Sequence, residues 1–292
     1  CKATFAEARF RSIIWNRQNA WKTHILSDIS SLNLVLLIIS VLVSGYFGGI
    51  VGMPLGPIRI FFMLFFGIDA LITFGTNLAI SFMMMLATVG NNLKNKRIDF
   101  KTGILFIVFG AILGPLVGGL VSEIFPQDIL LLLVSIMILV SAILILRAVH
   151  FPSKKTFDES NTKKNIIASL LNFFIGALGA AVGMVNGALR YPIMINYLNM
   201  KAKPASATNS LINLMVSIFA FIGHITTSGF SGNSHFNLNV FLLLGTAGFI
   251  GSFFGSRHVG FYSNKLILKI LYVLLFIMGI LLLFREVIWC LK

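Results

Sequence analysis

Two arginines stand inside strongly apolar stretches of this sequence, each just after a glycine-rich break. Arg59 and Arg190 close two fifteen-residue stretches, 45–59 and 176–190, which are offset by 176 − 45 = 131 and share seven identical residues. Chance would leave about one identity, so the stretches indicate an internal repeat. A guanidinium inside a bilayer is costly and normally faces a cavity or a partner. Because its planar fork of N–H donors suits an oxyanion, the pair predicts an anion site within a membrane.

The glycines before each arginine predict that it lies near the start of a short helix. If these helices begin near Gly56 and Gly187, each arginine is about three residues in, and its side chain leans back toward the helix N-terminus. That end of a helix is already positive, so it disfavours a cation and favours an anion between the two groups. Broken helices aimed at an anionic substrate recur in transporters. We therefore expect Gly52, Gly183 and Asn186 to line the same substrate site.

The alternative is that both arginines reach an interface or bind backbone carbonyls. Their repeated placement argues against this, and so do the acidic residues. None of the nine Asp and Glu residues lies in the middle of an apolar run, whereas cation carriers and proton pumps usually place a carboxylate there. The predicted core has buried positive charge and no balancing negative charge, as an anion site requires. A proton relay through a buried carboxylate is not supported.

Two Thr-Asn pairs follow the short apolar runs. Thr76-Asn77 and Thr208-Asn209 each begin a long apolar run, and their offset (208 − 76 = 132) is one position longer than that of the arginines. Their hydroxyl and amide groups could complete the hydrogen bonds of a bound oxyanion, or they could cap a helix. Both interpretations stay open at this point.

One histidine is a candidate for gating or proton binding. His224 lies near the end of an apolar run, where the first half has Asn92 at the same offset as the Thr-Asn pairs (224 − 92 = 132). A histidine at a pore mouth can titrate near neutral pH, although an interface histidine with a satisfied ring is the more common case. The other four histidines show no metal-ligand spacing, and we expect no metal and no cofactor.

The chain that carries these residues is too apolar for an ordinary soluble domain. It is 57% hydrophobic and 11% charged, against about 25% charged residues in soluble domains. Many runs approach the roughly 20 residues that cross a bilayer, which predicts an all-α, polytopic membrane helix bundle. The apolar runs cover residues 32–51, 57–67, 70–90, 103–123 and 128–149, and then 165–183, 188–199, 204–225, 237–256 and 265–289.

The order of these runs predicts two homologous halves. A basic and aromatic N-terminal segment, 1–31, is either a helix on the membrane surface or a poorly ordered tail. The first membrane repeat covers 32–150, a polar linker 151–164, and the second repeat 165–292. We expect about four spanning helices in each half plus one Gly-broken half-helix, because the short run is too brief to span.

Loop charges predict the topology. The net charge of +14 could suggest nucleic-acid binding, but Lys and Arg lie mainly in short segments between apolar runs, as in cytoplasmic loops. The expected partners are the lipid bilayer and a small anion, not nucleic acid. If the short run re-enters without crossing, the N-terminal segment, 94–101 and 152–164 all lie on one side, with the N-terminus cytoplasmic. The second half fits less well, and we favour parallel over inverted halves.

Repeated motifs resemble the sulfite exporter TauE/SafE family over about residues 33–289. The first copy reads GMPLG (52–56) and GTN (75–77); the second reads GMVNG (183–187), YP (191–192) and ATN (207–209). Stripes of small residues, GAILGPLVG (110–118) and GFIGSFFG (248–255), accompany them and favour close helix packing. The two middle glycines of the family motif are replaced here. The resemblance implies a multi-pass inner-membrane permease that exports sulfur-containing anions such as sulfite or organosulfonates.

We therefore predict a secondary transporter of small oxyanions that works by alternating access, with Arg59 and Arg190 as electrostatic clamps between the two half-helices. Two alternatives remain: a passive anion channel with the same site, and a non-transporting membrane assembly partner. No nucleophile elbow, phosphate loop or zinc-protease helix occurs in the sequence, so no residues support an enzyme.

Overall fold

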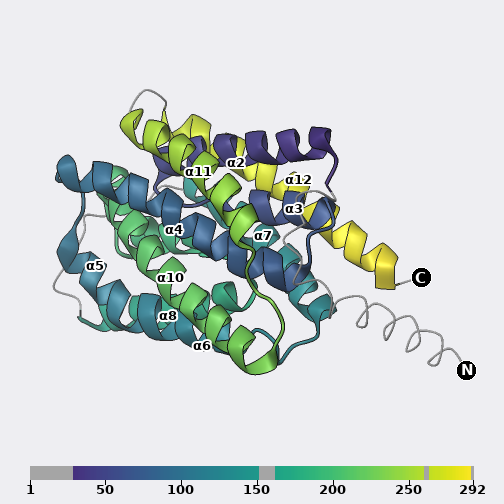
Figure 1. Cartoon of the computed structure of the whole chain (residues 1–292). Helices are drawn as coiled ribbons and strands as arrows, with labels where there is room; N and C mark the ends of the chain where they lie inside the picture. The colour runs from purple at the N-terminus through teal and green to yellow at the C-terminus, as the bar shows by residue number, and fades with distance from the viewer. Residues whose placement is uncertain (1–28, 151–161, 260–262, 291–292) are drawn as a thin grey trace, which may run out of the picture.

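The computed structural model describes residues 29–150, 162–259 and 263–290, and the regular structure in these ranges is helical (Figure 1). The predicted N-terminal segment and polar linker lie almost entirely outside the described residues. In chain order the α-helices are α2 (Ser31–Val51), α3 (Gly56–Phe65), α4 (Ala70–Lys94), α5 (Phe100–Phe106), α6 (Gly114–Leu120), α7 (Gln127–His150), α8 (Thr162–Ala181), α9 (Gly187–Pro192), α10 (Ala202–Ser231), α11 (Leu238–Arg257) and α12 (Asn264–Cys290). Two π-helical turns, η1 (Ile107–Leu113) and η2 (Ile193–Tyr197), follow α5 and α9.

Polar side chains fix where several helices begin. The Ser30 hydroxyl accepts from the backbone N–H of Asn33 at the start of α2 (3.3 Å), and the Asp69 carboxylate accepts from Leu71 at the start of α4 (2.9 Å). Asn237 caps α11 in the same way. Each cap satisfies one of the N–H groups that the first turn of a helix leaves without a partner.

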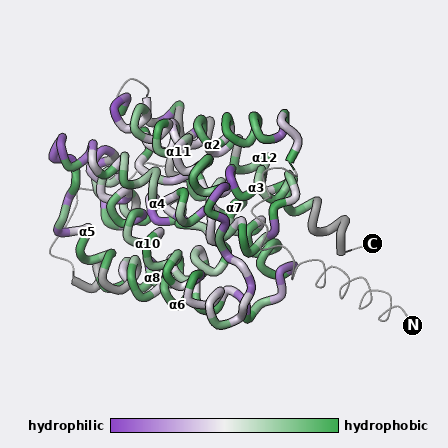
Figure 2. The backbone as a smooth tube through the Cα atoms, viewed as in Figure 1, coloured by the Kyte–Doolittle hydropathy of each residue, from purple (hydrophilic) through white to green (hydrophobic). Residues whose placement is uncertain are grey.

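Many of these helices are long and apolar enough to cross a bilayer (Figure 2). By length and composition, five described helices qualify: α2, α4, α7, α10 and α11. The bent segment α5–η1–α6 makes a sixth if it crosses as one unit, and α8 and α12 contain shorter described apolar stretches. The chain is a multi-pass membrane protein.

Each of the two predicted glycine breaks ends a long helix. Gly52 follows α2 with φ = 71° and Gly183 follows α8 with φ = 68°. Only glycine adopts this left-handed conformation without a steric penalty. The predicted short runs then form α3, and α9 followed by η2.

Helices α4 and α10 run antiparallel (Figure 1). At one end, the Asn92 amide near the end of α4 donates to the Ser210 hydroxyl near the start of α10 (3.1 Å). At the other end, Gly75 near the start of α4 abuts the backbone carbonyl of His235, just beyond α10. Because α4 and α10 hold equivalent places in the two predicted sets of helices, this arrangement contradicts the expectation of parallel halves.

The fourth segment of each set shows the same reversal. Helix α11 runs parallel to α4, since Asn237 donates its N–H to Thr76 Oγ1 (3.1 Å) and Asn91 donates to Ser256 Oγ (2.5 Å) at the far end. Segment α5–η1–α6 instead runs parallel to α10. Counterpart helices therefore run in opposite directions.

Small residues let the first helix of each set pack closely on the fourth helix of the other. Glycines of α11 abut backbone carbonyls of α2, and Gly49 of α2 abuts Ser252 of α11. Gly114 and Gly118 of α6 abut the carbonyls of Phe173 and Ala177 in α8. A Cβ at these glycines would meet backbone, so the predicted close packing of both glycine stripes is confirmed.

The two ends of the bundle differ in charge. Basic residues gather where α4 and α11 end and where α10 begins: Lys94, Lys96, Arg97, Lys201, Lys203 and Arg257. We call this the basic end. Asp69, before α4, and Glu123, after α6, lie at the opposite end, which we call the acidic end.

The start of α2 lies at the acidic end. Gly45 of α2 abuts Gly248, and Gly49 abuts Ser252 and Ser256, so α2 runs parallel to α11 and hence to α4. Residues 52–69 must therefore return across the bundle between α2 and α4. The expectation that the short run re-enters without crossing is wrong for this reason. The chain enters α2 from the acidic end, and not from the side of 94–101 as the loop charges predicted.

Candidate anion site

Both predicted arginines are completely buried inside the bundle. Arg59 is the fourth residue of α3 and Arg190 the fourth residue of α9, so each lies one turn into the short helix after a glycine break. The relative exposure of each is 0%. An arginine that snorkels keeps its charged head in water. Neither arginine does so.

Arg59 has a protein partner for every nitrogen of its guanidinium. Nε donates to Asn77 Oδ1 (2.8 Å), Nη2 to Ser81 Oγ (2.6 Å), and Nη1 to Met84 Sδ (2.8 Å). The three partners are four and three residues apart on α4, so they share one face of that helix. A thioether is a weak acceptor, so the contact with Met84 is the one that an anionic oxygen would replace most favourably.

Among the described residues, Arg190 has a partner for two of its three guanidinium nitrogens. Nε donates to Asn172 Oδ1 of α8 (2.5 Å), and Nη1 donates to Asn213 Oδ1 (2.5 Å) and Asn209 Oδ1 (3.4 Å) of α10. Nη2 is buried and has no hydrogen-bond acceptor among the described residues. A buried donor without an acceptor costs about 1–3 kcal/mol, and more when it is charged. An anionic oxygen beside Nη2 would remove that cost.

The acceptors around both guanidinium groups are neutral. They are amide oxygens, one hydroxyl and one thioether. In the part of the chain that the structure describes, no carboxylate contacts Arg59 or Arg190. Because charges interact strongly in a low-dielectric interior, these two positive charges favour an anion. The partners are side chains, so the alternative of arginines bound to backbone carbonyls does not hold either.

Two asparagines connect the arginines to the opposite glycine breaks. Asn77, which accepts from Arg59, donates its amide to the carbonyl of Gly183 (2.7 Å). Asn213, which accepts from Arg190, donates to the carbonyl of Gly52 (3.2 Å). Each arginine–asparagine pair thus holds the break that leads to the other arginine, and the two short helices are tied together.

Sequence reasoning missed four of the arginine partners: Ser81, Met84, Asn172 and Asn213. Asn213 lies one helical turn after Asn209, and its counterpart at the offset of the Thr-Asn pairs is Ser81 (213 − 81 = 132), which also binds an arginine. The repeat register contained that signal. The counterpart of Asn172 at the offset of the arginines is Val41 (172 − 41 = 131), an apolar residue, so the repeat gave no indication of it.

The predicted glycines leave room for the arginines and asparagines. A Cβ on Gly56 would lie 2.9 Å from Asn77 Nδ2, and a Cβ on Gly187 would lie 2.5 Å from Asn213 Nδ2. At Gly52 and Gly183 a Cβ would collide with backbone of α10 and α4. All four glycines therefore lie against the helices that carry the asparagines.

The predicted polar residues beside the arginines divide into two groups. Asn77 and Asn209 contact an arginine, as expected, and Asn209 also donates to the carbonyl of Gly187 (3.2 Å). The hydroxyls of Thr76 and Thr208 instead accept backbone N–H groups that precede α11 and α5. Asn186 precedes α9 with φ = 50° and donates to the Ile175 carbonyl (3.4 Å).

The two predicted gating residues lie at opposite ends of the bundle. Asn92 bonds Ser210 at the basic end. His224 lies toward the acidic end, where its ring bonds the carbonyl of Ala180 (2.7 Å) and the ring of His235 (3.0 Å). Both residues are buried, at 3% and 0% exposure, so neither faces open water in this conformation.

Comparisons with known proteins agree on a transporter family. The sequence model of the family "Sulfite exporter TauE/SafE" matches residues 31–282. Over 222 residues the chain is 25% identical to the "Probable membrane transporter protein YdhB" of Bacillus subtilis (strain 168), a match that covers 76% of this chain and 88% of that protein. No solved structure matches the chain. Because the family match extends over most of its length, this membrane protein belongs to the sulfite exporter TauE/SafE family.

Proposed function

We propose that this protein is a permease for small oxyanions and that the anion binds at the free donor of Arg190. The main support for the proposal is the environment of the Arg190 side chain. It is fully buried, its acceptors are neutral, and its Nη2 has no acceptor among the described residues. An oxyanion supplies both a negative charge and acceptor lone pairs. A transported anion that occupies the site for part of each cycle is a physical reason to keep this donor free.

Arg59 is the second clamp in this proposal. Its Nη1 is held by the Met84 thioether, which is a weaker acceptor than a charged oxygen. An anion that bridges the arginines would take over this contact and leave the stronger bonds to Asn77 and Ser81 intact. The proposed site thus consists of the two guanidinium groups, the asparagines beside them and the glycine breaks.

The substrate class that we propose is sulfur oxyanions, such as sulfite or organosulfonates. The family is described as sulfite exporters, and a sulfite or sulfonate group offers three oxygens to a planar guanidinium fork. The relative from Bacillus subtilis is named only a probable membrane transporter. The choice among sulfur oxyanions therefore depends on the flux measurements below.

The transport cycle that we propose is alternating access between two inverted halves, 32–150 and 165–292. The reversed direction of α4 against α10, and of α5–α6 against α11, supports this arrangement, which recurs in secondary transporters. Asn77 holds the second break and Asn213 the first. We expect one of these bonds to be released in the state open to one side and the other in the state open to the opposite side.

The orientation that we propose places the basic end in the cytoplasm, following the positive-inside rule. Lys94, Lys96 and Arg97 lie at this end with Lys201 and Lys203. The start of α2 then faces the outside of the inner membrane. Export would move the anion from the basic end to the acidic end.

Flux in proteoliposomes tests this function. Purified protein is reconstituted, and uptake of radiolabelled sulfite and of a labelled organosulfonate is measured for the wild type, Arg190→Gln and Gly90→Ala. Gly90 is the matched control because a Cβ there meets no atom within 4 Å. We expect the wild type and the control to transport and Arg190→Gln to lose nearly all flux. Full flux in Arg190→Gln would refute the role of this arginine.

The same vesicles separate the two alternatives. A carrier shows counterflow, in which unlabelled anion inside accelerates entry of labelled anion, whereas a passive channel does not. A non-transporting partner protein would show no flux and no anion-dependent rise in the temperature of unfolding.

A further inference from the structure

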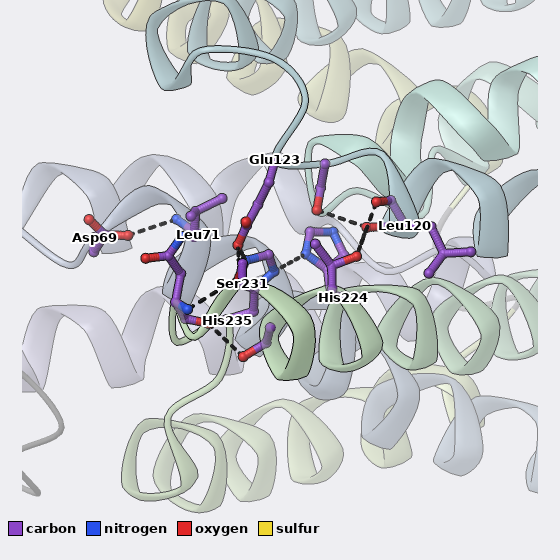
Figure 3. Close-up of polar contacts among 12 residues, drawn as sticks. Asp69, Leu71, Leu120, Glu123, His224, Ser231 and His235 are labelled. Atoms are coloured by element: carbon purple, nitrogen blue, oxygen red, sulfur yellow. Dashed lines mark hydrogen bonds and ion pairs between the residues drawn. The ribbon is translucent and has the colours of Figure 1, made fainter.

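A chain of hydrogen bonds joins a partly exposed carboxylate at the acidic end to the last turn of α8. Figure 3 shows Glu123, His235 and His224, which form most of it. Glu123 Oε1 contacts His235 Nε2 (2.5 Å), the Nδ1 atoms of His235 and His224 are 3.0 Å apart, and His224 Nε2 contacts the Ala180 carbonyl (2.7 Å). Ser231 also donates to Glu123 (2.7 Å). The Glu123 side chain is 19% exposed, and His235 is fully buried.

The number of hydrogens in this chain is fixed by its contacts. Each of the three contacts needs one hydrogen, because otherwise two lone pairs would face each other. Two neutral imidazoles carry only two ring hydrogens, and an ionised carboxylate carries none. The third hydrogen is therefore an additional proton, held within the group of Glu123, His235 and His224. This count holds whichever tautomer each ring adopts, because every contact involves a ring nitrogen.

The chain fastens the elements that surround the second glycine break. Ala180 lies three residues before Gly183, whose carbonyl accepts from Asn77. The backbone carbonyl of His235 lies against Gly75 in α4, two residues before Asn77. If these hydrogen bonds broke, the end of α8 would be free to move, and α8 leads to α9, the helix that carries Arg190.

We propose that Glu123, His235 and His224 form a proton-binding site that keeps the acidic end closed while one proton is bound. The proton enters from water at Glu123 and is held within this group of three side chains. When the proton is lost, two lone pairs face each other at one of the three contacts. That hydrogen bond then breaks, and the acidic end opens. The effect on anion flux rests on the proposed function, but the proton site itself does not.

Other ionisable groups at this end are engaged elsewhere or point to water. Among the residues whose side chains the structure describes, Asp69 caps α4 through the N–H of Leu71 (2.9 Å). Asp128 is exposed in the first turn of α7. The basic residues 201 and 203 of α10 lie at its opposite end. Asp128 therefore serves as a matched control for Glu123.

Hydrogen exchange in nanodiscs tests the proton site without requiring transport. The reporters are backbone amides at the end of α8, including those of Val182 and Gly183, which donate to carbonyls of the same helix end. Their protection, corrected for intrinsic exchange, is measured between about pH 5 and about pH 8, the range in which an ordinary histidine side chain changes its charge. If the closed state holds one more proton than the open state, protection falls by up to about tenfold per pH unit.

Two substitutions distinguish the bound proton from a merely structural chain. In Glu123→Gln an amide hydrogen replaces the additional proton, so protection should stay high and constant within about twofold across this range. His235→Gln provides the same test through a different residue, because its amide can donate to both Glu123 and His224. Asp128→Asn should behave as the wild type.

A wild type with pH-independent protection would overturn the proposal. So would an unchanged pH dependence in both Glu123→Gln and His235→Gln, or its loss in Asp128→Asn. In proteoliposomes, anion flux should rise with external pH in the wild type and stay constant in Glu123→Gln. Protection that depends on pH in a protein without anion flux would support the proton site and count against the permease.

Discussion

Replacing Arg190 by lysine should weaken anion binding much more than replacing Arg59 by lysine. Lysine keeps the positive charge but loses the planar fork, so the comparison isolates the geometry of the donors. At Arg190 the change removes Nη2, which is buried and has no protein acceptor in the described ranges. A hydrogen bond to a charged group contributes about 1.5–3 kcal/mol, which corresponds to a loss of affinity of about 10- to 150-fold.

Both changes break bonds that hold the arginine to the protein, but at Arg59 every nitrogen that is removed already has a protein partner. Nε and Nη2 donate to Asn77 and Ser81, so Arg59→Lys should lower the unfolding temperature, while its affinity for anions falls less than tenfold. Affinity is measured from the rise in unfolding temperature with sulfite concentration, because a ligand of the folded state stabilises it in proportion to ln(1 + [L]/Kd). Unchanged affinity in Arg190→Lys, or a larger loss in Arg59→Lys, would refute the assignment of the main contact to Arg190.

Three further substitutions test the frame around the site, each by thermal unfolding in detergent. Gly183→Ala should destabilise the protein by more than about 1 kcal/mol, because φ is 68° and the new Cβ meets the backbone of Phe74; Gly90→Ala, in open space, should leave stability the same or slightly higher. Asn77→Leu should lower the free energy of unfolding by about 2 kcal/mol or more, since it leaves a buried carbonyl and a guanidinium N–H without partners. An unchanged stability would contradict the inference that Asn77 ties the two glycine breaks together. Gly255→Leu should separate α2 from α11 and lower the yield of folded protein, whereas Gly90→Leu should not.

Much of the site could be predicted from the sequence because the repeat marks it twice. Arg59 and Arg190 occur in the same register after glycines that must adopt a left-handed conformation, and both are buried as expected. The long apolar runs likewise predicted helices that cross a bilayer, since backbone hydrogen bonds must be satisfied within each segment. The Thr-Asn pairs, one position out of that register, suggested a polar contact or a helix cap, and Asn77 and Asn209 make the contact.

The direction of the helices was not predictable in the same way. A run of ten to twelve apolar residues is too short to span alone, so hydropathy does not distinguish a re-entrant segment from one that completes a return path. Residues 52–69 form a return path across the bundle, because α2 and α4 run in the same direction. That choice inverts the second set of helices and moves the start of α2 to the acidic end.

The remaining residues were missed because the contacts join distant parts of the chain. Asn172 binds Arg190 from α8, and the equivalent position in the first half is Val41. Glu123 and His235 are far apart in the sequence and meet only because α6 and α10 lie together at the acidic end. Neither the repeat nor local periodicity contains that information.

The most direct test of the anion site is a structure determined with selenate, whose selenium gives an anomalous signal. We predict one strong selenium peak in the interior of the bundle, with an oxygen about 2.8 Å from Arg190 Nη2, and no such peak in Arg190→Gln. Selenate bound only at the surface of the basic end, with no acceptor beside Nη2, would contradict it.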